Sequence, residues 1–346
     1  MTIRVGLIGY GLAGSVFHAP LIEATPGLEL VGVVTSKRAQ VEAELPGVRV
    51  VEENELLESA NIDLMVVATP NRLHYEQARR ALLAGKHVVV DKPFTLRSAE
   101  AEKLIRMAKR EKRMLSVFHN RRWDHDFLTL KQCMEEGRLG PVHTYRARFD
   151  RYRPAVKERW KEQDAAGGGT LYDLGSHLID QALTLFGEPD TVWAEVRSQR
   201  DGAAAPDWFH MVLGYDKGVR VILDSGSVVA EPGPRFEVHG THGSFITYGA
   251  DRQEEALKAG LRPGDSGWGE NRTEERAWLT KFESDQLQRE QIPSLRGQYE
   301  VFYQGIRDAI LAKARPPVAP QEAARAIRVI ERALDSSREK RMVPFK

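Results

Sequence analysis

The chain has 346 residues, of which 42% are apolar. Because this length exceeds the usual size of a single hydrophobic core, we expect two domains. Its 50 basic residues nearly cancel its 49 acidic residues, which leaves a formal charge of +1. This balance gives no electrostatic reason for a nucleic acid or an anionic membrane as a partner, and it disfavours both classes of function.

Cysteine content and the apolar runs indicate the compartment. Cys133 is the only cysteine, so an intrachain disulfide is impossible and a reducing compartment fits best. The apolar run that follows Met1 is interrupted by Gly9 too early for a signal-peptide core, and no later run approaches membrane-spanning length. We therefore expect a soluble, cytoplasmic protein.

The first 120 residues alternate between short apolar runs and amphipathic segments. The expected strands cover residues 3–8, 28–34, 48–51, 64–68, 88–90 and 115–118. Continuous apolar runs indicate strands buried on both faces. The expected helices cover residues 15–23, 71–84 and 98–111. This alternation predicts a doubly wound parallel sheet in a domain over residues 1–120.

After residue 118 the pattern changes to alternating polar and apolar residues. The expected strands cover residues 143–153, 192–199, 208–215, 219–228, 236–239 and 244–248. Helices are expected over 172–186, 299–313 and 321–338, and the segment 250–294 is expected to form long loops with one hairpin. This pattern predicts a second domain over residues 121–346, an α+β domain with a largely antiparallel sheet.

A glycine-rich motif stands between the first expected strand and the first expected helix. It reads Gly9-Tyr10-Gly11-Leu12-Ala13-Gly14. In a dinucleotide-binding fingerprint the first glycine permits a tight turn, the second lets the backbone approach the pyrophosphate, and the third lets helix and strand pack closely. Alone the motif is also compatible with a plain turn, but its place in a βαβ unit favours a dinucleotide site.

The end of the second expected strand bears on the choice of coenzyme. Enzymes that use NAD place an acid there, on the ribose hydroxyl, whereas this chain has Thr35-Ser36-Lys37-Arg38. Hydroxyls beside two cations can bind a 2′-phosphate, so we expect NADP. The alternative is that Lys37 and Arg38 only decorate a loop.

Two further polar segments follow expected strands of the sheet. After the fourth strand comes Thr69-Pro70-Asn71, where Asn71 is able to cap a helix and His74 lies on its first turn, either as a coenzyme ligand or as a capping or surface residue. After the fifth strand comes Asp91-Lys92-Pro93. Ligands of open α/β sheets bind at these strand ends, and a lysine there can polarise a substrate oxygen during hydride transfer.

Asp173 and His177 stand four residues apart on the helix expected over 172–186. At helical pitch they share one face, so the carboxylate can orient the imidazole and support its protonated form, as an alcohol-oxidising base requires. The alternatives are a solvated surface pair or part of a metal site, but no further ligand cluster is evident and we expect no metal. The combined motifs predict a redox enzyme.

These motifs resemble those of the Gfo/Idh/MocA oxidoreductases over essentially the full chain. The resemblance is carried by the N-terminal fingerprint, by Asp91-Lys92-Pro93 and by Asp173-Leu174-Gly175-Ser176-His177. The segments 115–124, 149–154 and 236–240 are similar, more narrowly, to the NADP-dependent scyllo-inositol dehydrogenase subgroup. One departure is Asp91, since the family usually has glutamate before the lysine, and this puts in doubt a direct contact of Asp91 with the coenzyme.

The resemblance implies an N-terminal Rossmann domain, a second domain with an open-faced sheet, and catalytic roles for Lys92, Asp173 and His177. It implies that the open sheet is buried between subunits of a homodimer or homotetramer. The implied reaction interconverts scyllo-inositol and 2-keto-inositol (scyllo-inosose). The rivals are an NADP-dependent aldose dehydrogenase, a ketosugar reductase, and a coenzyme-sensing regulator without catalysis.

The subgroup also suggests substrate-pocket residues, each of which has a structural alternative. These candidates are Arg121, Arg122, Asp150, Tyr152 and Trp160. Asp150 is equally able to pair with Arg153 across strands, and Trp160 to lie in the core.

Overall fold

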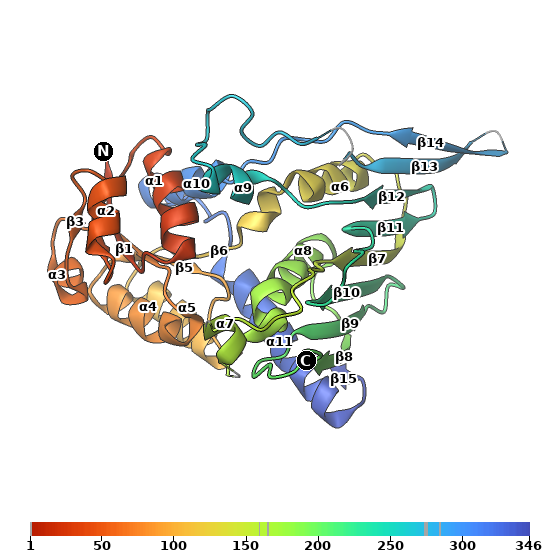
Figure 1. Ribbon diagram of the computed structural model, residues 1–346, viewed down its shortest axis with the longest axis horizontal. Coiled ribbons are helices and arrows are strands. Elements are labelled where there is room, and N and C mark those ends of the chain that lie inside the picture. Colours follow the sequence, from red (N-terminus) through yellow and green to blue (C-terminus); the bar gives the residue numbers. More distant parts are fainter. Residues whose placement is uncertain (1, 159, 165, 273–275, 284) are drawn as a thin grey trace. The chain divides into compact units, whose positions relative to one another are not determined.

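The computed structural model describes residues 2–158, 160–164, 166–272, 276–283 and 285–346 (Figure 1). The chain divides into two compact units. Unit 1 comprises residues 1–120, 253–268 and 298–324, and unit 2 comprises residues 121–252, 269–297 and 325–346. The division is therefore less simple than the two consecutive ranges that we predicted, because 253–268 and 298–324 return to the first unit.

Unit 1 is built on a six-stranded sheet. Its strands are β1 (Ile3–Ile8), β2 (Leu28–Val34), β3 (Arg49–Val50), β4 (Leu64–Val67), β5 (His87–Asp91) and β6 (Leu115–Phe118). They are paired in parallel in the order β3-β2-β1-β4-β5-β6. This order reverses beside β1, as in dinucleotide-binding doubly wound folds. All four residues of β4 are buried, which explains its continuous apolar sequence.

Helices cover the sheet of unit 1. They are η1 (Ala13–His18), α1 (Ala19–Glu23), α2 (Arg38–Glu44), α3 (Glu53–Glu58), η2 (Asn71–Leu73), α4 (His74–Leu83), α5 (Ser98–Arg110), α9 (Gln253–Lys258) and α10 (Glu300–Leu311). Within the unit, α1 packs on β2, and α4 packs on β4 and β5 (Figure 1). The helices α2, α3 and α9 are absent from the sequence-based prediction.

Unit 2 is built on a nine-stranded mixed sheet. Its strands are β7 (Val142–Arg148), β8 (Thr191–Arg197), β9 (Trp208–Gly214), β10 (Arg220–Gly226), β11 (Phe236–Gly240), β12 (Gly243–Thr247), β13 (Trp278–Glu283), β14 (Gln286–Gln291) and β15 (Val343–Pro344). Their order is β14-β13-β12-β11-β7-β10-β9-β8-β15, and only the pair β7–β10 is parallel among the strands described. The predicted hairpin within 250–294 is β13–β14.

One face of this sheet forms the core of unit 2, and helices cover it. Besides the short η3 (Asn120–Trp123), which begins at the end of unit 1, these helices are α6 (His125–Glu135), η4 (Leu171–Gly175), α8 (Ser176–Phe186) and α11 (Pro320–Glu339), whose first residues belong to unit 1. The short α7 (Trp160–Gln163) precedes η4 and contributes no residue to the core. The ring of Tyr145 on β7 lies 5.3 Å from that of Phe186 on α8. The ring of Phe127 on α6 lies 6.3 Å from that of Phe236 on β11.

The opposite face of the sheet carries charged side chains. Nε of Arg146 lies 3.6 Å from a carboxylate oxygen of Asp224, and Nη1 of Arg148 lies 3.3 Å from one of Glu237. The three strands that bear these residues, β7, β10 and β11, alternate over much of their length between buried and more exposed positions, which is why the sequence alternates. The predicted fold class, a parallel sheet domain followed by a domain with a largely antiparallel sheet, is confirmed.

Two further observations concern the chain as a whole. Among the residues described, no helix combines the length and the apolar composition needed to cross a membrane. Cys133 is buried on α6, and burial raises the pKa of its thiol.

Candidate functional site

The glycine-rich loop of unit 1 leaves open space beside a helix N-terminus. Gly9 has φ +100°, and a Cβ there would collide with the carbonyl of Ala68. A Cβ on Gly14 would collide with the carbonyl of Gly9, whereas no atom lies within 4 Å of the position that a Cβ on Gly11 would take. The loop therefore has the tight turn, the close helix packing and the free space that a pyrophosphate group needs.

The segment after β2 presents hydroxyl and cationic groups at the surface. The Thr35 hydroxyl accepts a hydrogen bond from the backbone N–H of Lys37 at 3.1 Å, and Ser36 and Lys37 are exposed. Arg38 begins α2, donates to the carbonyl of Val50 at 3.1 Å and lies 3.6 Å from Glu42. Lys37 is thus a stronger candidate for a phosphate ligand than Arg38, part of whose guanidinium is engaged within the unit.

His74 joins the loops that follow β4 and β5. It is buried, with Nδ1 2.8 Å from the carbonyl oxygen of Pro93 and Nε2 2.9 Å from that of Thr69. Burial lowers the pKa of this imidazole, against the opposing effect of Asp91. We therefore give His74 the role of fixing the two loops rather than of contacting a coenzyme.

The capping role predicted for Asn71 is wrong. Pro70 occupies the N-cap position of η2 and Leu73 that of α4. Asn71 is instead the first residue of η2 and is buried. The dipeptide Pro70-Asn71 starts a short 3₁₀ turn before the α-helix, and this turn displaces the helix start by three residues.

Asp91 at the end of β5 forms contacts inside unit 1. Its carboxylate accepts a hydrogen bond from the backbone N–H of Lys92 at 2.9 Å and lies 3.7 Å from Nε2 of His18. Burial alone raises the pKa of Asp91, but His18 and the charge of Lys92 outweigh it and hold that pKa below its ordinary value. His18 in turn contacts the Tyr303 hydroxyl at 2.6 Å. Asp91 thus supports the backbone at Lys92, which is half-buried.

In unit 2, Asp173 and His177 lie on consecutive helical segments. Asp173 belongs to η4, a π-helical turn, and His177 to the first turn of α8. The Asp173 side chain is 22% exposed, whereas His177 is buried. The fingerprint helix η1 is also π-helical, and such turns recur at functional sites because the extra residue changes which side chains share a face.

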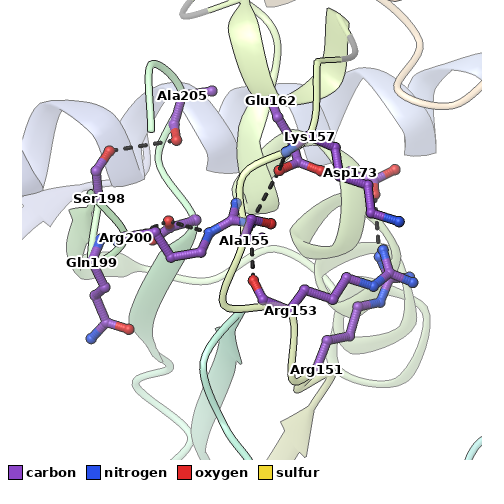
Figure 2. Close-up of polar contacts among 11 residues, drawn as sticks. Arg151, Arg153, Ala155, Lys157, Glu162, Asp173, Ser198, Gln199, Arg200 and Ala205 are labelled. Atoms are coloured by element: carbon purple, nitrogen blue, oxygen red, sulfur yellow. Dashed lines mark hydrogen bonds and ion pairs between the residues drawn. The ribbon is translucent and has the colours of Figure 1, made fainter. Parts of the chain in front are cut away.

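Two cations that our sequence analysis did not select hold the Asp173 carboxylate. Nζ of Lys161 donates to one oxygen at 2.6 Å. Nη1 of Arg151 lies 3.7 Å from the other (Figure 2). Both cations come from the connection between β7 and η4. No spacing in the sequence indicates this contact, since Arg151 lies in the alternating stretch that was expected to be a strand and Lys161 in a stretch where no element was expected.

Arg121 and Arg122, predicted to line a substrate pocket, are held inside unit 2. Arg121 is buried, lies 3.3 Å from Asp124 and stacks over the ring of Phe149 at 4.7 Å. Arg122 donates to both oxygens of Asp180 at 2.8 and 2.6 Å. This bidentate pair fastens the start of unit 2 to the middle of α8, the helix that carries His177.

We expect Arg122→Met to destabilise the protein by about 3–5 kcal/mol, because it leaves the Asp180 carboxylate in a site where its side chain is 3% exposed. The measurement is the free energy of unfolding in urea. The double variant Arg122→Met with Asp180→Leu removes both charges and should regain most of the loss. Equal losses in the single and double variants would contradict the role of the ion pair.

The other predicted pocket residues lie along the β7–η4 connection or at its start. Asp150 accepts a hydrogen bond from the N–H of Gly226 at 2.9 Å, and burial raises its pKa. Tyr152 is 62% exposed and forms an isolated bridge with Val228. Trp160 begins α7, with its ring 5.8 Å from Nζ of Lys161. Of the three, Tyr152 has the most surface left for a ligand.

Among the residues described, no group of three or more His, Cys, Asp or Glu side chains is arranged to hold a metal ion. The candidate residues therefore fall into two groups, one in each unit. One is the set of strand ends and the glycine-rich loop in unit 1, and the other is the Asp173–His177 turn with its cations in unit 2.

Comparison with known proteins covers nearly the whole chain. Residues 3–119 match the model "Oxidoreductase family, NAD-binding Rossmann fold", and residues 131–345 match "Oxidoreductase family, C-terminal alpha/beta domain". The chain is 45% identical to scyllo-inositol 2-dehydrogenase (NADP(+)) IolW of Bacillus subtilis, over 99% of this chain and 96% of that protein. It is also 45% identical to an uncharacterized oxidoreductase, YdgJ of Escherichia coli, over 97% of this chain and 96% of that protein.

A solved structure also resembles this chain over its full length. The structure of YvaA of Bacillus subtilis has a TM-score of 0.97 and 44% identity, with 100% of this chain and 99% of that chain covered. The predictions of a dehydrogenase and of a nicotinamide coenzyme are confirmed.

Proposed function

Because the chain belongs to the Gfo/Idh/MocA family of oxidoreductases, we propose that it interconverts a secondary alcohol of a cyclic polyol and the corresponding ketone with NADP(H). The observation that carries the proposal is the placement of Asp173 and His177. A carboxylate held by Lys161 and Arg151 precedes a buried imidazole by one helical turn. This arrangement suits a general base for an alcohol.

The proposal assigns a role to each of the three residues. His177 removes the proton of the substrate hydroxyl, and Asp173 orients His177 and stabilises the imidazolium that forms. Lys92 stabilises the negative charge that develops on the substrate oxygen. When bound, NADP⁺ accepts hydride from the carbon that bears this oxygen.

The coenzyme is held by residues of unit 1. The pyrophosphate faces the backbone of Gly9, Tyr10, Gly11 and Leu12. Gly14 allows η1 to pack closely against this loop. Thr69 and Pro70 line the nicotinamide side, where Asp91 and His74 act through the loops that they hold. Thr35, Ser36 and Lys37 contact the 2′-phosphate, with Arg38 nearby, and this makes NADP the coenzyme.

We expect Lys37→Ala to lower kcat/KM for NADP about tenfold while that for NAD stays unchanged, because one charge-assisted hydrogen bond to phosphate is lost. Initial rates with both coenzymes measure this. Lys103→Ala, an exposed position on α5, is the matched control. An equal loss with NAD and NADP would contradict the assignment of Lys37.

The proposed substrate pair is scyllo-inositol and 2-keto-inositol, the pair implied by the name of the Bacillus subtilis relative. A panel of inositols, aldoses and ketoses, assayed with NADP⁺ or NADPH, tests it. We expect the highest kcat/KM with scyllo-inositol. A higher value with an aldose would favour an aldose dehydrogenase, and one with an open-chain ketose a ketosugar reductase.

A coenzyme-sensing regulator of the same fold is the rival from another class. Tight NADP binding without turnover on any member of the panel would favour it. The presence of Lys92, Asp173 and His177 together supports the enzyme.

We also propose that the protein works in the cytoplasm as a homodimer or homotetramer. The charged face of the nine-stranded sheet, with Arg146, Arg148, Asp224 and Glu237, is the proposed contact between subunits. Light scattering after size-exclusion chromatography tests this, and a monomeric mass would contradict it.

A further inference from the structure

The β7–η4 connection contacts Asp173 and is itself held in place by a buried arginine, Arg200. Here the connection means residues 149–158, 160–164 and 166–170. Lys161 is the residue that joins it to Asp173, with Nζ 2.6 Å from the carboxylate oxygen and the Lys161 side chain 39% exposed. A half-exposed lysine normally samples many rotamers, so this contact is only as well defined as the backbone that presents it.

The backbone around Lys161 does not hold itself in place. Lys161 belongs to α7, a helix of four residues, and a helix this short is unstable on its own. Contacts from outside must fix it.

Arg200 supplies these contacts. Its guanidinium Nη1 donates to the carboxylate of Glu162 at 3.0 Å and to the carbonyl oxygens of Arg153 and Ala155 at 3.1 Å each (Figure 2). Its Nε donates to Asp207 at 2.8 Å. Glu162 directly follows Lys161 in sequence and also accepts a hydrogen bond from the N–H of Lys157 at 3.0 Å. One side chain therefore fastens the connection on both sides of Lys157.

Arg200 and its partner Asp207 lie inside unit 2 and not on its surface. The Arg200 side chain is 6% exposed and that of Asp207 is 2% exposed. Asp207 also accepts hydrogen bonds from the N–H groups of Gln199 and Arg200 at 2.7 and 3.2 Å. Buried charges in such a network keep one geometry, because each displaced partner leaves another charge unpaired.

We propose that Lys161 is a positioning residue for Asp173 in the reaction proposed above, and that Arg200 is the anchor that places Lys161. Among the residues described, Lys161 from α7 and Arg151 from the start of the connection bear on the Asp173 carboxylate. His177 follows Asp173 by four residues along the helix. The two cations favour the ionised carboxylate. Asp173 thus remains an acceptor for the imidazole when His177 has taken up the substrate proton.

The first experiment replaces Lys161. We expect Lys161→Met to lower kcat/KM for the polyol about tenfold to a hundredfold, the equivalent of one charge-assisted hydrogen bond. The acid limb of the pH profile of kcat/KM should move upward, because Asp173 then ionises less readily. Lys161→Arg should restore most of the lost kcat/KM and return the acid limb of the pH profile most of the way to its wild-type position. The Kd for NADP should not change. Lys157→Met, an exposed lysine of the same connection, is the charge-matched control.

This inference rests on the proposed function for the reaction, so a second readout is independent of turnover. The ¹³C resonance of the Asp173 carboxyl, assigned by its absence in Asp173→Asn, is titrated in the wild type and in Lys161→Met. A higher midpoint in the variant supports the inference even if no polyol is oxidised, in which case only the proposed function fails. An unmoved midpoint, or a pH profile of Lys161→Met equal to that of the wild type, overturns it.

The anchor is tested with Arg200→Lys, which keeps the charge but cannot reach all four acceptors from one point. Trypsin should cleave after Lys157 or Lys161 faster in this variant, and kcat/KM for the polyol should fall as in Lys161→Met. Cleavage and kinetics both equal to those of the wild type would rule out Arg200 as the anchor.

Discussion

Replacing His177 with Ala is expected to lower kcat for the polyol by about a hundredfold or more, because it removes the proposed general base. His177 is buried on the first turn of α8, so the substitution also leaves a small cavity. His177→Gln fills most of this space without a basic ring and should show the same loss. Steady-state rates with NADP⁺ and scyllo-inositol measure it.

Two controls separate a chemical role of His177 from a structural one. His143→Ala, at an exposed position of β7, should leave kcat unchanged. The Kd for NADP should stay the same in both His177 variants, because the fingerprint belongs to unit 1. Turnover of His177→Gln within threefold of the wild type would remove His177 from the mechanism.

Replacing Lys92 with Met is expected to lower kcat by about a hundredfold to a thousandfold, the usual effect of removing one donor to a developing oxyanion. Lys92 follows β5, and its backbone N–H is fixed by Asp91 at 2.9 Å. The variant keeps this backbone contact and the length of the side chain, so the loss reports the ammonium group. The measurement is kcat in both directions of the reaction.

Lys92→Arg should recover only part of the loss, because a guanidinium is larger and donates in a fixed plane. Lys109→Met, exposed near the end of α5, is the control for loss of a lysine charge. If Lys92→Met changed only KM for NADP, Lys92 would be a coenzyme ligand without a part in the chemistry.

The parallel sheet was predictable from the sequence because its strands are buried on both faces. β6 is buried at all four positions, and its sequence, apolar apart from Ser116, predicted a strand of the same extent. α2 was not predictable for the opposite reason. Val41 is its one buried residue, so the helix has no apolar stripe to detect.

α6 escaped prediction because its buried face is partly polar. His125, Asp126 and Thr129 are buried together with Phe127 and Leu130, and this mixture hides the helical period. The sequence also leaves both a pocket role and a structural role open for Arg121 and Arg122. Their ion pairs with Asp124 and Asp180 inside unit 2 could not be read from it.

Some residues of the candidate site could likewise be selected from the sequence, and others could not. Gly9, Gly11, Gly14, Asp173 and His177 stand in local motifs, so spacing along the chain was enough to select them. The contact between Lys161 and Asp173 depends on Arg200, which lies 39 residues further along the chain than Lys161. Tertiary contacts of this kind have no signature in spacing.

The π-helical turn that carries Asp173 has a consequence for how this protein tolerates change. A π turn holds one residue more than an α turn, and each residue of an α-helix rotates the chain by about 100°. Deleting Leu174 or Gly175 would remove the extra residue and shorten the separation of Asp173 and His177 from four residues to three, which changes their relative orientation although both side chains survive. Chain length in this stretch is therefore as important to function as amino-acid identity, and codon-deletion scanning should find it far less permissive than substitution scanning does.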